Sequence, residues 1–353
     1  MEDLGMTSFW NNKRVLITGH TGFKGSWLTF WLNQMGAKVF GYSLQPDVNQ
    51  SLFSQLKLEL DIDHQIGNIC DEILFKEYVL DCKPEFIFHL AAQSLVLKSY
   101  INIPETWKTN VIGTVNLLES LREYKHSCSV VIVTTDKVYH NNEWEYGYRE
   151  NDILGGLDPY SASKSGVELV VQSYRSVFIK ENKNISIASA RAGNVIGGGD
   201  WCENRLIPDI VRALTLKESI ETRNPGSVRP WQHVLEPLSG YLSLGEKMSK
   251  YGIFDEAFNF GPISDGNRTV ENVIQTALKS WPGKYHININ KLAPHEANLL
   301  KLTTDKARSQ LGWEPRWSFD LAIQKTMEWY KNVHEGISPI SITKSQIEFY
   351  EKS

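Results

Sequence analysis

The sequence lacks the features of a secreted, membrane-spanning or nucleic-acid-binding protein. Its four cysteines form no C-x-x-C pair, so neither a disulfide framework nor a zinc cage or other metal site is predicted. No apolar run reaches the roughly 18 residues of a membrane span, and the first residues, MEDLGMTSFWNNKR, contain no signal-peptide core. A net charge of −4 with scattered lysines and arginines argues against a nucleic-acid-coating surface. We therefore expect a cytoplasmic protein in a reducing compartment, with no membrane or nucleic-acid partner.

The composition is that of a soluble globular protein. Hydrophobic residues make up 41% of the 353 residues and charged residues 22%, which is enough to bury one large or two smaller cores. Tryptophan is frequent, with eleven copies. Trp201 and Trp231 could flank a planar ligand group, but packing in the core explains them equally well.

The first half of the chain alternates apolar, β-rich runs with helical patterns. This alternation predicts an α/β fold with a Rossmann-type, doubly wound parallel sheet that helices cover on both faces. We expect strands at 14–18, 38–42, 86–90, 130–134 and 185–190, and helices at 25–35, 71–80, 104–124 and 160–181.

The alternation ends near residue 192. Helical patterns follow at 204–217, 236–250, 269–281 and 318–334, with strand-like segments at 219–235 and 251–265. No linker separates the two parts. We predict a dinucleotide-binding domain at 1–192 and a smaller, mixed α/β lobe at 193–353, with segments near 232–262 returning to the first domain.

A glycine motif follows the first expected strand. RVLITGHTGFKGSWL places Gly19, Gly22 and Gly25 between a strand and a helix. The first glycine permits a tight turn, the second a close approach of the backbone to a pyrophosphate, and the third close packing of helix on strand. The helix N-terminus then offers free N–H groups to phosphates. The motif predicts a dinucleotide site.

The choice between NAD and NADP is less clear from the second strand. NAD-binding folds usually carry an acidic residue at its end, where this chain has Tyr42, Ser43 and Leu44. Asp47 lies a few residues beyond the position that this acidic residue usually occupies. No arginine marks a 2′-phosphate site, although Lys24 lies in the glycine loop.

Two further groups of polar residues have the order that chemistry at a parallel sheet requires. VTTDKVY follows the fifth expected strand with Thr135, Asp136 and Lys137, and LDPYSASKSG follows with Tyr160 and Lys164. Positions four apart share one face of a helix, so the phenol and the ammonium would lie together. Tyr-x-x-x-Lys alone arises often by chance, but its order after the glycine loop and the threonine points to a proton-transfer site.

These features resemble the extended short-chain dehydrogenase/reductase family and, within it, the CDP-glucose 4,6-dehydratases. The resemblance is carried in chain order by TGHTGFKGSWL, HLAAQSLV, TTDKVY, YSASKSGVE, RAGNVIGGGDW, RLIPD, RPWQHVLEPLSGYL, NFGP and HEA (295–297). dTDP-glucose dehydratases carry TDE where this chain has Asp136-Lys137, which places it in the CDP branch. Asn68 departs from relatives that carry GDI.

The resemblance implies an NAD-dependent hydro-lyase that feeds deoxysugar and surface-polysaccharide synthesis. It would convert CDP-glucose to CDP-4-keto-6-deoxyglucose by oxidation at carbon 4, loss of water across carbons 5 and 6, and return of the hydride to carbon 6. Tyr160 would take the 4-hydroxyl proton with Lys164 favouring the phenolate, and Thr135 would bind the 4-oxygen. Protonated Asp136 would release the 6-hydroxyl.

Lys137 has two readings. As the base that removes the carbon 5 proton it must be neutral; as a cation it would only stabilise an enolate. We favour the base.

The resemblance also assigns binding residues. Substrate contacts fall to Ser94, Asn194, Arg205, Arg229 and His233, since an Arg fork matches phosphate oxygens. NAD contacts fall, besides Tyr160 and Lys164, to Gly19, Thr21, Gly22, Phe23, Gly25, Ser43, Asn68, Ile69, Leu90, Ala91, Ala92, Gln93 and Thr109. In this family the helices expected at 104–124 and 160–181 pair with a second copy, which implies a homodimer or homotetramer.

Other activities remain compatible with part of the pattern. A dehydratase of another nucleotide-sugar would share all of it. A sugar-nucleotide 4-epimerase or decarboxylase needs the glycine loop and Tyr/Lys pair, but not Asp136-Lys137. A non-catalytic dinucleotide-sensing regulator needs only the glycine loop.

Overall fold

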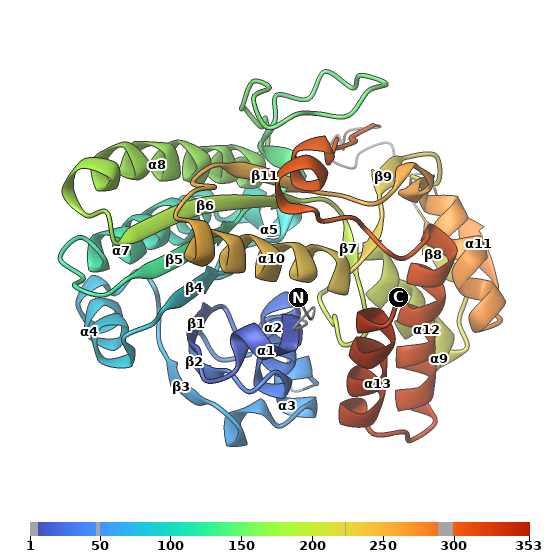
Figure 1. Cartoon of the computed structure of the whole chain (residues 1–353). Coiled ribbons are helices and arrows are strands. Elements are labelled where there is room, and N and C mark those ends of the chain that lie inside the picture. The colour runs from blue at the N-terminus through green and yellow to red at the C-terminus, as the bar shows by residue number, and fades with distance from the viewer. Residues whose placement is uncertain (1–5, 47–49, 223, 289–298) are drawn as a thin grey trace.

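A seven-stranded parallel sheet forms the centre of the computed structural model (Figure 1), which describes residues 6–46, 50–222, 224–288 and 299–353. The strand order is β11-β6-β5-β4-β1-β2-β3, and every neighbouring pair is parallel. The strands are β1 Arg14–Thr18, β2 Lys38–Ser43, β3 Asp63–Ile66, β4 Phe86–His89, β5 Cys128–Val133, β6 Ile185–Ala192 and β11 Ala257–Phe260. The predicted doubly wound α/β fold is confirmed.

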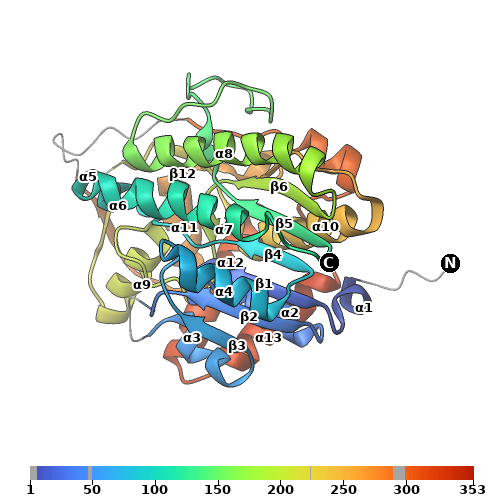
Figure 2. The ribbon, with the colours of Figure 1, turned by 90° about the vertical axis from the view of Figure 1, so that its left-hand side faces the viewer.

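Helices cover both faces of the sheet. Val15 and Ile17 of β1 face the core shared with α2 (Phe23–Gln34) and α10 (Leu235–Tyr251). Leu16, between them, faces the opposite core, whose helices are α4 (Glu72–Cys82), α7 (Gly113–Ser120) and α8 (Pro159–Glu181). Figure 2 shows these three helices in front of the strands. Because successive strand residues point to opposite faces, strands covered on both sides are apolar throughout.

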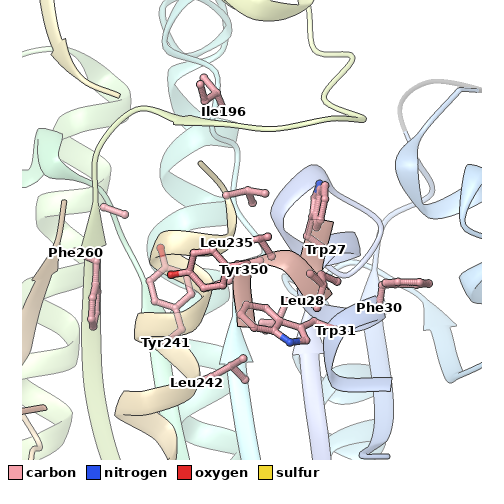
Figure 3. Packing of buried hydrophobic residues seen from close by; sticks show 14 of the residues in the cluster. Trp27, Leu28, Phe30, Trp31, Ile196, Leu235, Tyr241, Leu242, Phe260 and Tyr350 are labelled. Atoms are coloured by element: carbon pink, nitrogen blue, oxygen red, sulfur yellow. The ribbon is translucent and has the colours of Figure 1, made fainter. Parts of the chain in front are cut away.

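The core on the α2 side contains several large aromatic residues (Figure 3). Trp27 and Trp31 of α2 are fully or almost fully buried in the same core as Tyr241 of α10. Trp31 also packs edge-on against Tyr350, with ring centroids 5.9 Å apart, and its Nε1 donates to Glu351 over 2.8 Å. The last helix, α13 (Pro339–Glu351), thus returns to the first part of the chain.

The second lobe lies beyond the carboxyl ends of the strands. Its helices are α9 Leu206–Leu216, α11 Val270–Ser280 and α12 Phe319–His334. Short paired strands complete it: β7 Val195–Ile196 with β10 Gln232–His233, β8 Ile220–Thr222 with β13 Tyr285–Ile287, and β9 Val228–Pro230 with β12 Asn267–Thr269. The position of this lobe leaves a cavity between it and the sheet.

The five strands expected from the sequence form within about two residues of their predicted limits. The helix expected at 104–124 is interrupted: α6 (Ile103–Trp107) passes into a π-helical turn, Lys108–Ile112, before α7 begins. Within that turn, buried Asn110 accepts from Gln93 N and donates to Ser163 Oγ, which ties the helix to the loop after β4 and to α8. The sequence pattern did not reveal helix α5 (Val96–Ile101) or α13.

No helix in the described ranges is long and apolar enough to cross a membrane.

Candidate active site

A cavity of about 1250 Å³ opens at the carboxyl ends of the strands, between the sheet and the second lobe. From β1 the chain builds the sheet outward in one direction through β2 and β3. It then crosses back to β4 on the other side of β1, so the strand order reverses between β1 and β4. Open α/β sheets bind ligands outside the carboxyl ends at such a point. The two lobes supply opposite walls of one cavity.

The glycine loop has the shape that a diphosphate requires. Gly19 has φ +76°, and a Cβ there would lie 2.7 Å from the Ala91 nitrogen. A Cβ on Gly25 would lie 2.1 Å from the Gly19 carbonyl oxygen, so any side chain would push helix from strand. Helix α2 begins after Gly22 without a side-chain cap, and Gly22, Phe23 and Lys24 line the cavity. Free N–H groups at this end fit a dinucleotide pyrophosphate.

The expected cofactor residues form a continuous wall. Thr21 Oγ1 contacts Ser43 Oγ at 2.8 Å and donates to the Leu44 carbonyl, which closes the end of β2 onto the loop. Asn68 Oδ1 accepts from Cys70 N, so its amide shapes the turn after β3. The cavity lining includes Gly19, Thr21, Gly22, Phe23, Gly25, Ser43, Asn68, Ile69, Leu90, Ala91, Ala92 and Thr109. Asp47 and the HEA piece at 295–297 lie outside the described residues.

Gln93 departs from the expectation. Its amide donates to the Leu95 carbonyl and to Thr106 Oγ1, and its Oε1 accepts from Leu95 N. The side chain is thus used to shape its own loop, and Gln93 is not among the cavity-lining residues. Its side chain supports the turn after β4, and its contact with the cofactor stays a prediction.

The Tyr-x-x-x-Lys turn stands at the start of α8. Asp158 caps the helix by accepting from Ser161 N, and Pro159 occupies its first position, which suits a helix start. Tyr160 and Lys164 are both buried at the cavity wall. Lys164 Nζ donates to the Val133 carbonyl over 3.1 Å, so the ammonium lies at the end of β5.

Burial dominates the electrostatics of this pair. It raises the pKa of Tyr160 to about 12, although a side-chain hydrogen bond with Thr135 opposes the rise. It lowers the pKa of Lys164 to about 8, while the carboxylate of Glu168 acts in the opposite direction. Because a buried charge is costly, burial favours the neutral phenol of Tyr160 and makes the Lys164 ammonium easier to deprotonate than that of an exposed lysine.

Thr135 and Asp136 meet Tyr160 in the same cavity. Thr135 Oγ1 donates to Asp136 Oδ1 over 3.0 Å and also interacts with Tyr160. Asp136 is 1% exposed, and its Oδ2 has no hydrogen-bond partner in the described chain. A buried carboxyl oxygen without a partner at a cavity wall is suited to meet a substrate hydroxyl.

Three further lysines, Lys24, Lys98 and Lys137, line the cavity besides Lys164. Lys137 lies in the 3₁₀ turn Asp136–Val138, and its N–H donates to Thr135 Oγ1. Lys24 comes from the glycine loop, and the sequence reading gave it no chemical role. Burial lowers the pKa of Lys24 to about 7, reinforced by the charges of Arg205 and Lys164 and opposed by that of Asp136. The cavity wall therefore carries lysine amines as well as the Asp136 carboxyl group.

The second lobe contributes a basic side chain at the far wall. Arg205 Nη1 forms an ion pair with Asp200 at 2.8 Å, and Nη2 donates to Ser94 Oγ. Asp200, which the sequence reading missed, is held in turn by Tyr330, whose hydroxyl donates to its carbonyl. Its place directly after GNVIGGG was the available signal. Asn194, Arg229 and Trp231 also line the cavity, whereas Trp201 packs edge-on against Tyr330.

His233 is the clear error among the expected substrate contacts. It is fully buried outside the cavity lining, with Trp317 at 4.6 Å and Trp27 at 5.8 Å between ring centroids. Its Nδ1 accepts from Leu235 N at the start of α10. Strand β10 points this residue into the aromatic core, so the histidine supports the fold instead of touching the sugar nucleotide.

His233→Ala is accordingly expected to lower the free energy of unfolding by about 2–4 kcal/mol, because it leaves a cavity between two indoles and removes an acceptor. The KM for sugar nucleotide should stay at the parent value. Urea denaturation and steady-state kinetics check the two halves. A large rise in KM without loss of stability would restore the substrate role.

Known proteins resemble the chain over nearly its whole length. The family described as GDP-mannose 4,6 dehydratase matches residues 16–326. The CDP-glucose 4,6-dehydratase of Salmonella typhimurium is 44% identical over 97% of this chain and 97% of its own. A dTDP-D-glucose 4,6-dehydratase of Dictyostelium discoideum is 27% identical, over 91% of this chain and 82% of its own.

Solved structures share the fold. A dTDP-glucose 4,6-dehydratase from Bacillus anthracis, determined in complex with NAD, superposes with a TM-score of 0.77 at 23% identity, covering 92% of this chain and 99% of that one. A UDP-glucose 4-epimerase from Thermotoga maritima, with UDP-glucose, gives 0.75 at 21% identity, covering 90% and 99%. The extent of the family match and the 44% identity to a relative of the same length establish that this chain belongs to the nucleotide-sugar 4,6-dehydratase family.

Proposed function

We propose that this protein dehydrates CDP-glucose to CDP-4-keto-6-deoxyglucose with NAD as its cofactor. The observation that carries the proposal is the convergence of Tyr160, Thr135 and Asp136 on one cavity that also contains the open glycine turn. The Oδ2 atom of Asp136 has no hydrogen-bond partner among the described residues. The 44% identity to a CDP-glucose 4,6-dehydratase supports the choice of sugar nucleotide. Lys137 after Asp136, in place of the glutamate of dTDP enzymes, supports the same choice.

The oxidation needs a proton acceptor at the sugar 4-hydroxyl. Bound NAD⁺ supplies hydride acceptance at carbon 4, later hydride return at carbon 6, and a positive charge. Tyr160 takes the hydroxyl proton, and Thr135 holds the oxygen as the carbonyl forms. Lys164, one helical turn along, adds positive potential that lowers the cost of the phenolate. Since the pKa of Tyr160 is raised to about 12, mainly by burial, the positive charges of NAD⁺ and Lys164 are needed to form the phenolate.

The elimination needs a base at carbon 5 and an acid at carbon 6. Asp136, nearly fully buried, donates its proton to the departing 6-hydroxyl. Lys137 removes the carbon 5 proton, which the neighbouring ketone has made acidic. A lysine acts as a base only in its neutral form.

Lys137→Ala decides between the two roles of that lysine. If Lys137 is the base, exchange of the carbon 5 hydrogen with solvent deuterium falls by at least about a hundredfold, while binding of the sugar nucleotide changes little. Mass spectrometry of recovered sugar nucleotide measures the exchange. Exchange at the parent rate would leave Lys137 only as an electrostatic helper.

The division of labour between the lobes follows from the walls of the cavity. Residues 1–192 supply the glycine loop and the reacting side chains, and residues from 193 onward supply Asn194, Arg205 and Arg229. An arginine fork suits the diphosphate, and Asp200 fixes the direction of the Arg205 guanidinium. Segments at 235–251 and 257–260 belong to the main sheet layer, which supports an interleaved arrangement.

One assay tests the proposal against its alternatives. Purified protein is incubated with NAD and CDP-glucose, and the alkali-induced absorbance of a 4-keto sugar is recorded. The proposal expects this signal with CDP-glucose and a much weaker one with UDP-, dTDP- or GDP-sugars. A signal that appears only with another nucleotide-sugar would mean that the enzyme is a dehydratase specific for that nucleotide base. Conversion to a 4-epimer without the keto signal identifies an epimerase, and no conversion at all favours a dinucleotide sensor.

We further propose that the protein acts as a homodimer or homotetramer. Helices α6 and α8 and the π-helical turn carry an apolar outer face, with Ile103, Trp107, Ile112 and Leu169 exposed. Such a face on two neighbouring helices suits pairing with its own copy about a two-fold axis. Analytical ultracentrifugation tests this, since a stable monomer of 40.2 kDa would refute it.

A further inference from the structure

A buried carboxylate lies one helical turn beyond Lys164, behind the cavity. Glu168 of α8 is 4% exposed and accepts four hydrogen bonds. Its Oε1 receives Thr134 Oγ1 at 2.6 Å and Arg191 Nε at 3.0 Å; its Oε2 receives Ser189 Oγ at 2.7 Å and Arg191 Nη2 at 2.8 Å. These donors come from the end of β5 and from β6. One carboxylate thus joins α8 to two strands.

This junction lies directly beside the reacting groups. Thr134 immediately precedes Thr135 and Asp136, and its N–H donates to the Ala190 carbonyl of β6. Lys164 Nζ bonds the carbonyl of Val133, one residue earlier. The Tyr160–Lys164 turn and the Thr135–Asp136 turn are therefore held together by two links, one from Lys164 and one from Glu168.

We propose that Glu168 is a positioning residue for the reaction: its carboxylate fixes α8 against β5 and supplies the counter-charge that keeps Lys164 an ammonium. The effects of Glu168 on kcat rest on the proposed function, whereas its effect on Lys164 does not. Fully hydrogen-bonded networks of this kind have one geometry, because a partly satisfied one leaves buried groups unpaired.

The electrostatic surroundings support this role. Burial opposes ionisation of Glu168, but Arg191 and its other donors hold the pKa of the carboxyl below its usual value. Glu168 is the charged group that raises the pKa of Lys164 against burial. The other titratable groups near the pair, from every neighbouring element, are Lys24, His89, Asp136, Tyr139, Arg175 and Arg191.

Glu168→Gln tests the counter-charge while conserving size. With the negative charge removed, Lys164 gives up its proton at a lower pH, so the alkaline limb of the kcat profile should move down by about one pH unit. The same shift should appear without substrate or cofactor. Trace acylation of Lys164 with acetic anhydride, quantified by peptide mass spectrometry across pH, should show a parent midpoint of about 8 and a lower midpoint in the variant.

Glu119→Gln is the matched control. Glu119 accepts from Tyr174 Oη at 2.5 Å, so it also joins α8 to a neighbour by a carboxylate, but at a distance from Lys164. Its replacement should leave both the acylation midpoint and the alkaline limb at the parent values. If Glu168→Gln lowers kcat equally at every pH with an unchanged midpoint, the carboxylate is only structural and the proposal is overturned.

A second pair of variants covers the case in which Glu168→Gln does not fold. Thr134→Val removes one donor to Glu168 but keeps the charge, so kcat should fall about tenfold with the KM for CDP-glucose and the Lys164 midpoint unchanged. Thr134→Ser, which keeps the hydroxyl, should restore the rate. Parent-like kcat in Thr134→Val would overturn the positioning role. A parent protein inactive on CDP-glucose would refute the proposed function, while the acylation comparison would still test Glu168.

Discussion

Replacing Tyr160 by phenylalanine should lower kcat with CDP-glucose by about a thousandfold, within the usual range for loss of a general base. The ring stays in its buried position beside Thr135, so only the proton acceptor is removed. Because the 4-hydroxyl proton must leave before anything else happens, both ketone formation and carbon 5 exchange should stop. Rapid-mixing absorbance of the reduced cofactor and deuterium exchange measure the two steps.

Binding should survive this change. Calorimetric Kd values for NAD and for CDP should remain within about threefold of the parent, since neither needs the phenolic proton. Tyr124→Phe is the matched control, because Tyr124 is equally buried but donates to the Pro84 carbonyl at the opposite end of the sheet. That variant should lose about 1 kcal/mol of stability and no turnover. Unimpaired oxidation in Tyr160→Phe would remove Tyr160 from the mechanism.

The sequence was sufficient wherever a function depends on a short segment. The glycine loop, the Thr135–Asp136 turn and the Tyr160–Lys164 turn each follow an apolar strand or a helix-start signal within a few residues. In a parallel sheet every strand ends at the same edge, so segments that follow different strands must meet there. This is why residues far apart in sequence could be assigned to one cavity before its walls were known.

What the sequence could not provide were pairings over long distances and the direction of single side chains. Strand β3 reads DHQI, which has one apolar residue because it is an edge strand. The return of Ala257–Phe260 beside β6 depends on burying Phe258 and Phe260 in a core assembled from the whole chain. His233 follows two cavity-lining residues closely, and nothing local distinguishes a ligand from a core residue.

The Glu168 network was likewise invisible. A glutamate in SASKSGVELV reads as a solvent-facing helix residue, since unpaired glutamates are rarely buried. The ion pair with Arg191 of β6 offsets the free-energy cost of burying the Glu168 carboxylate. The partner is 23 residues away in sequence and on another element, so no local pattern specifies the pair.

Asp136→Asn should separate the two halves of the reaction. The amide keeps the size of the carboxyl and its contact with Thr135, but it cannot give a proton to the departing 6-hydroxyl. We expect kcat to fall by about a hundredfold or more, with oxidation at carbon 4 intact. Reduced cofactor should then accumulate in a single turnover, and carbon 5 exchange should persist, because Tyr160 and Lys137 are unchanged.

This pattern differs from that of Tyr160→Phe, in which neither reduced cofactor nor exchange appears. Asp255→Asn is the control, since the Asp255 carboxyl is partly buried but accepts from Ile187 N on β6, in a region that does not line the cavity. It should show parent kinetics. If Asp136→Asn eliminates water at the parent rate, the acid must be another group. If the variant loses oxidation as well, Asp136 acts earlier, at the sugar 4-hydroxyl that Thr135 holds. Accumulated 4-keto-glucose nucleotide with its 6-hydroxyl still present, identified by mass spectrometry after borodeuteride trapping, would fix Asp136 as the acid of the elimination.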